Sequence, residues 1–217
     1  LDLFEVRLRN AELGISDFVQ AFVGVFRDFD LETDEDGLTF YKLYAPGGRH
    51  ILSWRHVLWP AGVSNRSDFR NVPAETILKT VVQYNLTSDA SVANDRHREG
   101  DLLAGMGFDI QIAADQARGD NLTLAFMGGN VLSVLQKVAE QGGGDFSLTW
   151  QGGDEWVFEF HPGQLGADKS AGNDRVLFAL SNNTMRNPRL RRVGAAATAA
   201  IAAGQGEGLN REVSPVT

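Results

Sequence analysis

Hydrophobic and polar residues alternate through much of the first seventy positions, which is the pattern of strands with one buried face. Turn signals at Asp36-Gly37 and Pro46-Gly47-Gly48 divide this region. The segments expected as strands are 1–9, with a bulge near Phe4, then 17–32, 37–45 and 49–59. Four such segments at short spacing predict an antiparallel sheet or a barrel.

The hydrophobic period changes at Pro73, from which apolar residues recur at helical spacing over 73–85. A second helix is expected over 130–141, with Asn130 as its N-cap and the glycines from Gly142 as its end. The other segments expected as strands are 108–114, 121–127, a hairpin of 145–150 with 155–160 across Gln151-Gly152-Gly153, and 175–180.

The composition changes again at Gly194, after which alanine and glycine dominate. Alanine favours a helix over 194–203, whereas the flanking glycines favour a close-packed strand or a connector, and both alternatives stay open. The chain begins at Leu1 rather than Met and stops at 211–217 without a finished element. We therefore expect the sequence to be a fragment of a longer protein.

Composition and charge exclude several classes of function. The 217 residues are 43% hydrophobic and 22% charged, which is typical of a globular protein. The chain has no cysteine, so disulfides, thiolate catalysis and cysteine-ligated metals are excluded. No apolar run of the sequence reaches the ~20 residues of a membrane helix, so no membrane insertion is expected. The net charge of −8 argues against a protein that grips nucleic acid.

The stretch 27–37, RDFDLETDEDG, carries the densest group of acids. These six residues are the candidate site: Asp28, Asp30, Glu32, Asp34, Glu35 and Asp36. A calcium loop would need a bidentate acid about five residues after the glycine, and no acid stands within reach beyond Gly37. We therefore favour a hairpin with acids on one face, the apolar Phe29 and Leu31 turned into the core, and no bound metal.

Other candidate chemistry is weak. His50 and His56 would share one face of the strand expected at 49–59, but a third zinc ligand is not visible nearby. Asp154 and Glu155 stand at a turn, and no nucleophile motif or phosphate loop occurs. We therefore expect no catalytic residues and no cofactor. Tryptophans 54, 59, 150 and 156 fit either core and interface packing or a sugar-stacking platform.

Five pieces of sequence in a fixed order carry a resemblance to a known family. The pieces are PAETILKTVVQYNL, NDR, GGNVLSVLQKVAEQGGGDFSLTW, WVFEFHPGQLGADKSAGNDRVLFAL and AAGQGEGLNREV. In this order they resemble the minor tail or baseplate hub proteins of siphoviruses that infect Gram-positive hosts. The resemblance covers roughly residues 38 to 213 and is strongest from Pro73 to Leu180.

The resemblance implies an α+β, β-rich fold: a tail-hub-like β-barrel domain with an inserted α/β domain of two helices and antiparallel strands. Residues 1–72 and 174–193 would form the barrel-like tube domain, 73–173 the inserted domain, and 194–217 the start of a further β domain. Such hubs are trimers of two-barrel subunits, whose pseudo-sixfold symmetry suits a hexameric tail ring.

The resemblance also implies a structural role rather than catalysis. The protein would be made in the host cytoplasm and would sit at the virion tail tip, as a homotrimer that joins the tail tube to the distal apparatus. Its partners would be the distal tail protein ring, the tape-measure protein and other tail-tip or receptor-binding proteins. DNA would pass through without specific binding, and the acids of 28–36 would line or flank the channel. The alternative is a receptor- or glycan-binding module at the tail tip.

Overall fold

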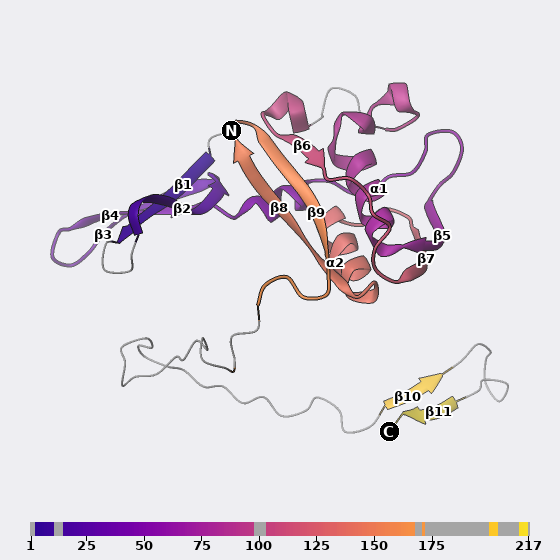
Figure 1. Ribbon diagram of the computed structural model, residues 1–217. Coiled ribbons are helices and arrows are strands. Elements are labelled where there is room, and N and C mark those ends of the chain that lie inside the picture. Colours follow the sequence, from indigo (N-terminus) through magenta and orange to yellow (C-terminus); the bar gives the residue numbers. More distant parts are fainter. Residues whose placement is uncertain are drawn as a thin grey trace. The chain divides into compact units, whose positions relative to one another are not determined.

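The computed structural model describes residues 3–10, 15–97, 103–167, 171, 200–203 and 213–216. The chain divides into two compact units, residues 1–167 and residues 168–217. The fold of the described residues is α+β and rich in strands, and their sheets are open, with two or three strands each. The chain is drawn as a ribbon in Figure 1.

The first unit begins with two antiparallel strand pairs. Strand β1 (Leu3–Asn10) pairs with β2 (Ile15–Val25), and β3 (Asp28–Thr33) pairs with β4 (Thr39–Tyr44). Strands β1 and β4 confirm the strands expected at 1–9 and 37–45, whereas the segment 17–32, expected as one strand, is broken after Val25 into β2 and β3. The bulge expected near Phe4 is wrong, because Phe4 pairs in register with Gly24 and the register shifts between Val6 and Arg7. We call the two pairs together the β arm; Figure 1 shows them to one side of the helices.

The expected strand at 49–59 is wrong, because Gly48–Trp54 form a 3₁₀ helix, η2. Ile51 and Leu52 are both fully buried, and a strand would have turned two consecutive residues to opposite faces. The first residue of η2 has to be glycine, because a β-carbon on Gly48 would lie 2.0 Å from the ring of Trp156. His50 therefore lies on a helix, and the predicted strand face shared with His56 does not exist.

Both predicted helices are confirmed within one residue at their ends. Helix α1 spans Ala74–Leu86 and follows β5 (Ser67–Pro73). Helix α2 spans Val131–Gln141, and the side chain of Asn130 caps it by accepting a hydrogen bond from the amide of Ser133. The two helices pack against each other, α1 against β5 and α2 against η2.

A three-stranded sheet, in the order β6–β9–β8, supports the helices. Its strands are β6 (Asp109–Ile112), β8 (Gly144–Gly152) and β9 (Glu155–Pro162), and β5 pairs separately with β7 (Asn121–Phe126). The predicted hairpin of β8 and β9 is confirmed, but β6 runs parallel to β9, so the expectation of antiparallel strands alone is wrong. A parallel pair needs a long connection, which β7, α2 and β8 supply here.

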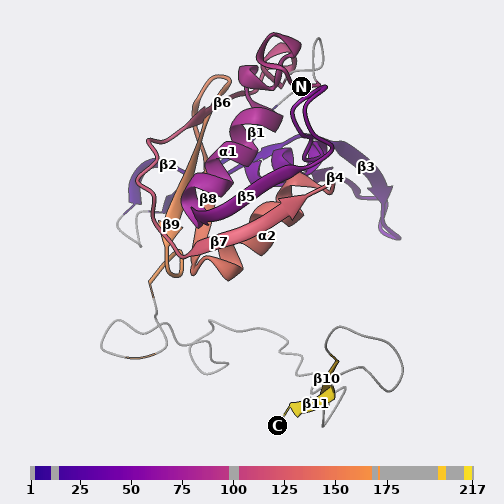
Figure 2. The same ribbon diagram turned by 90° about the vertical axis from the view of Figure 1, so that its right-hand side faces the viewer.

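The core of the first unit is continuous across its elements. Apolar faces of both helices meet alternate residues of the sheet and buried residues of η2 and β2. The central residues are Val25, Ile51, Leu52, Ile77, Leu78, Leu135, Phe146, Trp156, Phe158 and Phe160. We call η2, α1, α2 and β5 to β9 the α/β body, because they share this core; Figure 2 shows it from the side.

In the second unit, β10 (Ala200–Ala203) pairs antiparallel with β11 (Val213–Val216). The alanine-rich stretch therefore contains a strand, and the end of the chain contains an element that the sequence did not predict. The strand expected at 175–180 and the return of 174–193 to the first domain lie outside the described residues. The division into tube, inserted and further domains thus stays a prediction.

Candidate functional site

The acidic stretch folds as a β-hairpin, as its alternation predicts. The turn from Asp34 to Leu38 is closed by backbone bonds, and the Asp34 carboxylate accepts hydrogen bonds from the amides of Asp36 (3.0 Å) and Leu38 (2.8 Å). Gly37 takes a positive φ of 79°, which favours glycine. Asp34 is therefore a turn-forming residue. Glu35 and Asp36 stand exposed in the same turn.

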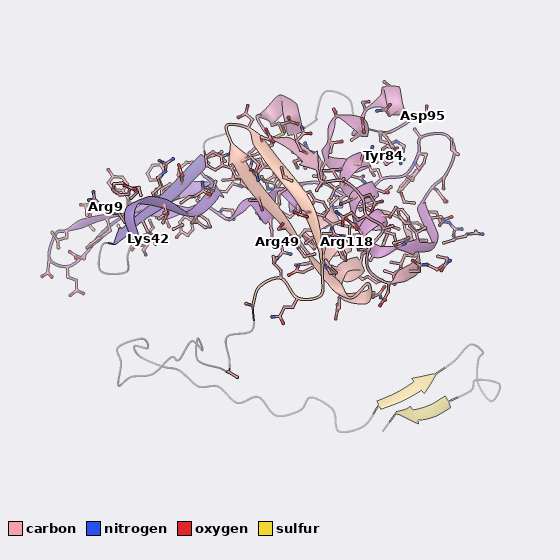
Figure 3. The ribbon with its side chains drawn as sticks, in the orientation of Figure 1. Arg9, Lys42, Arg49, Tyr84, Asp95 and Arg118 are labelled. Atoms are coloured by element: carbon pink, nitrogen blue, oxygen red, sulfur yellow. The ribbon has the colours of Figure 1, made fainter. Side chains whose placement is uncertain are left out.

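One face of the hairpin is acidic. Asp28, Asp30 and Glu32 pair across the strands with Tyr44, Lys42 and Phe40, and directly paired residues point to the same side. Lys42 donates to Glu32, and the Tyr44 hydroxyl donates to Asp30 at 2.8 Å. These bonds raise the pKa of both Lys42 and Tyr44, because their proton-bearing forms are the donors. One lysine faces three acids, so the face keeps a net negative charge. Figure 3 labels this lysine, Lys42, on the β arm.

The opposite face of the hairpin is apolar and exposed. Phe29 pairs with Leu43 and Leu31 with Tyr41, and these four side chains are 46 to 70% exposed. The prediction that Phe29 and Leu31 turn into the core is wrong, because no residue of the first unit's buried core packs over this face. The alternation gives the hairpin one acidic and one apolar face, and both faces are exposed.

The neighbouring pair β1–β2 is anchored at one end and exposed at the other. Val25 is fully buried in the core, and Leu3 and Val23 pack against that core. Farther along the pair, these large apolar side chains are exposed: Leu8, Phe18, Val19 and Phe22. Both strand pairs of the β arm therefore carry exposed apolar side chains beyond the end that is anchored in the body.

The tryptophans do not form an exposed platform. Trp156 is 2% exposed, and Trp54 and Trp150 are half-buried and pack against the core. Trp59 is also half-buried, with its ring edge-on to His97 at 5.8 Å. Exposed aromatic side chains lie instead on the β arm, where Tyr41 is 70% exposed.

Sequence reasoning missed a serine–histidine contact on the β8–β9 hairpin. Ser147 Oγ lies 2.9 Å from His161 Nε2, on the face opposite the core residues Phe146 and Phe158. The contact could have been predicted from the register of the hairpin, because a tight turn at Gly152-Gly153 brings Ser147 and His161 near each other. Asp145, directly opposite His161, accepts its hydrogen bonds from Arg49 and the Phe146 amide instead. The contact lacks the orienting carboxylate of a triad.

A buried ion cluster joins the start of α1 to the loop after β6. Glu75, fully buried, accepts hydrogen bonds from Lys79 at 2.6 Å and from three nitrogens of Arg118 at 2.9 Å. Arg118 also donates to the Phe160 carbonyl on β9. Burial alone would raise the pKa of the Glu75 carboxyl, but the bonds from Arg118 and Lys79 outweigh burial and lower this pKa to about 2. The sequence showed Glu75 only as a first-turn acid.

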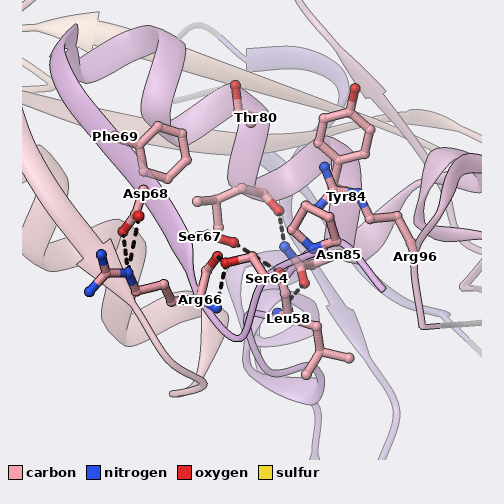
Figure 4. A pocket seen from close by; sticks show the side chains of 12 residues that line it. Leu58, Ser64, Arg66, Ser67, Asp68, Phe69, Thr80, Tyr84, Asn85 and Arg96 are labelled. Carbon is pink, nitrogen blue, oxygen red and sulfur yellow. Dashed lines mark hydrogen bonds and ion pairs between the residues drawn. The ribbon is translucent and has the colours of Figure 1, made fainter. Parts of the chain in front are cut away.

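A pocket of about 350 Å³ lies between β5 and α1 (Figure 4). Asn85 is one of the residues that line the pocket. The Asn85 side chain accepts a hydrogen bond from the Leu58 amide and donates one to the Val81 carbonyl. At one side the Arg96 guanidinium stacks on the Tyr84 ring at 3.8 Å. The Asn85 amide is satisfied by these bonds, whereas the buried Arg96 Nε has no hydrogen-bond partner among the described residues.

Within the described part of the chain, no group of three or more histidine, aspartate or glutamate side chains is arranged to hold a metal ion. No helix among the described residues has the length and apolar character needed to cross a membrane. Comparison of the chain with protein-family models, with curated proteins and with solved structures finds no match.

Proposed function

We propose that the protein is a structural subunit of a bacteriophage tail tip, which acts by assembly rather than by chemistry. The observation that carries the proposal is the exposed apolar face of the β3–β4 hairpin, formed by Phe29, Leu31, Tyr41 and Leu43. An isolated two-stranded hairpin is marginal in water, so such a face needs cover from another surface. The order of sequence motifs that resembles siphovirus hub proteins supplies the identity of the assembly.

In this proposal the covering surface belongs to neighbouring copies in a homotrimeric hub ring at the virion tail tip. The ring joins the tail tube to the distal apparatus and contacts the distal tail protein ring, the tape-measure protein and other tail-tip or receptor-binding proteins. The finer fold is a tube domain from 1–72 and 174–193 with 73–173 inserted. The acidic face of the hairpin borders a channel, where like charge keeps DNA from adhering.

The mass of the full chain in solution tests this proposal. We expect native mass spectrometry and sedimentation to give three times the 23.6 kDa of one chain. Leu31→Lys should weaken the trimer by at least tenfold, since it places a charge in the buried face. Asp30→Lys, one position away on the acidic face, is the matched control and should leave the trimer intact. A monomer at high concentration, without density on the tail axis of virions, would overturn the proposal.

A receptor- or glycan-binding module is the second candidate, because Tyr41 and its neighbours are exposed aromatic side chains of the kind that stack on sugars. The two functions differ in what Tyr41→Ala changes. A glycan binder would lose capture on a host cell-wall glycan surface while its oligomeric state stayed the same. A hub subunit would lose association between its own copies instead.

A further inference from the structure

Among the described strands, β6 pairs along one edge only. In the sheet order β6–β9–β8 it has one neighbour, and the amides of Asp109 and Ala113 donate to the Asp154 and Phe158 carbonyls of the β9 side at 2.8 and 3.0 Å. In a parallel pair, alternate residues turn their amide and carbonyl groups to opposite edges. The backbone groups of Ile110 and Ile112 therefore point away from β9.

A groove runs along the other edge of β6. It has a volume of about 400 Å³, within the range of natural binding clefts, and lies between β6 and α1. Thr80, Gln83 and Thr87 line it on the helix side, and Ile110, Gln111 and Ile112 line it on the strand side. The groove is thus bounded by a helix and by strand backbone, with Ile110 at its floor (3% exposed), and no backbone hydrogen bond joins Ile110 or Ile112 to a loop in the described part of the chain. A strand edge beside a helix is an arrangement that can accept an added strand.

The charge along the groove is negative. Asp109 and Asp89 line the groove near the end of α1. Asp115 lines it near the start of α1, where its carboxylate accepts a hydrogen bond from Thr76. None of the three forms a salt bridge with another side chain in the described ranges of the chain. Lys79 also lines the groove, but its ammonium group is held by Glu75 and the Ala114 carbonyl.

We propose that this groove binds an extended peptide with basic side chains, taken from a partner protein, which pairs with β6 as a fourth strand of the sheet. Its backbone bonds the groups of Ile110 and Ile112 that face away from β9. A basic residue across from Asp109 forms an opposite-charge cross-strand pair, and a second one meets Asp115. The proposal goes beyond the assembly function and does not depend on it, since the groove lies on the body and the assembly face on the β arm.

The carboxylates favour a peptide over a metal ion. They are spread along the groove rather than gathered at one point, and each already accepts a local hydrogen bond: Asp109 from Gln111, Asp89 from Gln83 and Asp115 from Thr76. Backbone groups that face away from β9 at every second residue match the repeat of a strand. Both features select a chain that is extended and positively charged.

A labelled peptide tests the proposal on the full chain. The probe is fluorescein-labelled Thr-Lys-Val-Lys-Thr-Lys-Val-Lys, measured by fluorescence anisotropy, and the same peptide with glutamate for lysine is the charge control. We expect the lysine peptide to bind at least tenfold more tightly than the glutamate peptide. Asp109→Lys should weaken binding of the lysine peptide by at least tenfold, whereas Glu140→Lys, an exposed position on α2, should leave it unchanged.

Backbone methylation of the peptide separates strand addition from simple charge attraction, and it requires no change to the protein. N-methylation of the lysine positions and N-methylation of the threonine and valine positions block opposite edges of the extended peptide. We expect one set to abolish binding and the other to retain it. Hydrogen exchange by NMR should show new protection at the amides of Ile110 and Ile112.

Three results would overturn the inference. The first is equal binding of both methylated sets, which would mean that no strand is added. The second is protection confined to residues outside β6 and α1. The third is the lack of any binding at millimolar peptide. Each of these outcomes is independent of whether the chain forms a trimer, because Asp109→Lys and Leu31→Lys alter different surfaces.

Discussion

Two hairpins of this protein have the same hydrophobic pattern and opposite surroundings. In β8, Phe146 and Leu148 alternate with polar residues, and both side chains are buried beneath the helices. In β3–β4, Phe29 and Leu31 alternate with acids just as regularly and remain about half exposed. Alternation therefore reports that a strand has an apolar face, and it does not report whether that face is covered within the same chain.

What covers the β8–β9 hairpin is set by distant sequence. The helices α1 and α2 bring their apolar stripes to its inner face, and Gly48 allows η2 to approach Trp156. The β3–β4 hairpin has no such neighbour in the buried core of the first unit. The difference indicates that the body is stabilised by its own packing, while the β arm has surface available for another molecule.

The largest expected effect is in the ion cluster of the body. Replacing Glu75 by Gln leaves Lys79 without its carboxylate partner, and we expect a loss of about 3–5 kcal/mol in the free energy of unfolding. Glu140→Gln, on the exposed face of α2, should change it by less than about 0.5 kcal/mol. Urea unfolding of both variants measures the difference, and equal losses would show that the cluster does not stabilise the body.

The same cluster gives the body an acid dependence. The pKa of Glu75 falls from the ordinary 4.5 to about 2 on folding, so its stabilisation is complete above about pH 4.5 and is lost as the pH falls toward 2. The wild-type protein should therefore lose stability across this window more steeply than Glu75→Gln. Parallel pH curves for the two proteins would contradict the low pKa.

A pair of leucines on strands tests the contrast between the hairpins directly. Leu148 on β8 is 8% exposed and Leu31 on β3 is 57% exposed. We expect Leu148→Ala to cost about 2–5 kcal/mol in unfolding free energy, through lost burial and the cavity left behind. Leu31→Ala should cost less than about 0.5 kcal/mol at concentrations where the chain is monomeric. Similar costs for both would mean that the hairpin face is buried within the chain.

The sequence predicted secondary structure better than it predicted which distant residues come into contact. Both helices and the strands β1, β4 and β6 to β9 lie where the periodicity placed them, because that signal comes from neighbouring residues. The one strand expected at 17–32 is instead divided into β2 and β3. The stretch 49–59 was misassigned because Ile51 and Leu52 are consecutive apolar residues, which suit a buried strand or a buried helix equally. The bonds from Arg118 to Glu75 span 43 residues, so no local pattern could predict the buried cluster.

The candidate site was likewise predicted only in part. The hairpin, its turn and the common face of Asp28, Asp30 and Glu32 followed from the alternation and from Asp36-Gly37. The exposure of Phe29 and Leu31 could not be predicted from the alternation, because it depends on whether another element of the fold packs over them. Burial is a property of the whole fold, whereas the turn is a property of five residues.

A smaller effect is expected at the hairpin turn. Asp34→Ala removes the two hydrogen bonds to the amides of Asp36 and Leu38, and we expect a local loss of about 1 kcal/mol. Hydrogen exchange should accelerate in β3 and β4 by about fivefold, while the amides of β8 and β9 keep their rates, because the arm opens separately from the body. Acceleration throughout the body would contradict this independence of the two regions.

The smallest expected effect is that of calcium, for which we predict no change. Along β3 the same-face residues Asp28, Asp30 and Glu32 are spaced about 6.6–7 Å apart, whereas calcium ligands lie about 2.3–2.6 Å from the ion. Asp30 and Glu32 already accept hydrogen bonds from Tyr44 and Lys42, so coordination would have to break both bonds and curl the strand. Thermal melting with calcium and with a chelator should give the same midpoint, and calorimetry should show no saturable heat. A micromolar isotherm abolished by Asp30→Asn would instead make the acidic face a metal site and remove the reason to regard it as a repulsive surface.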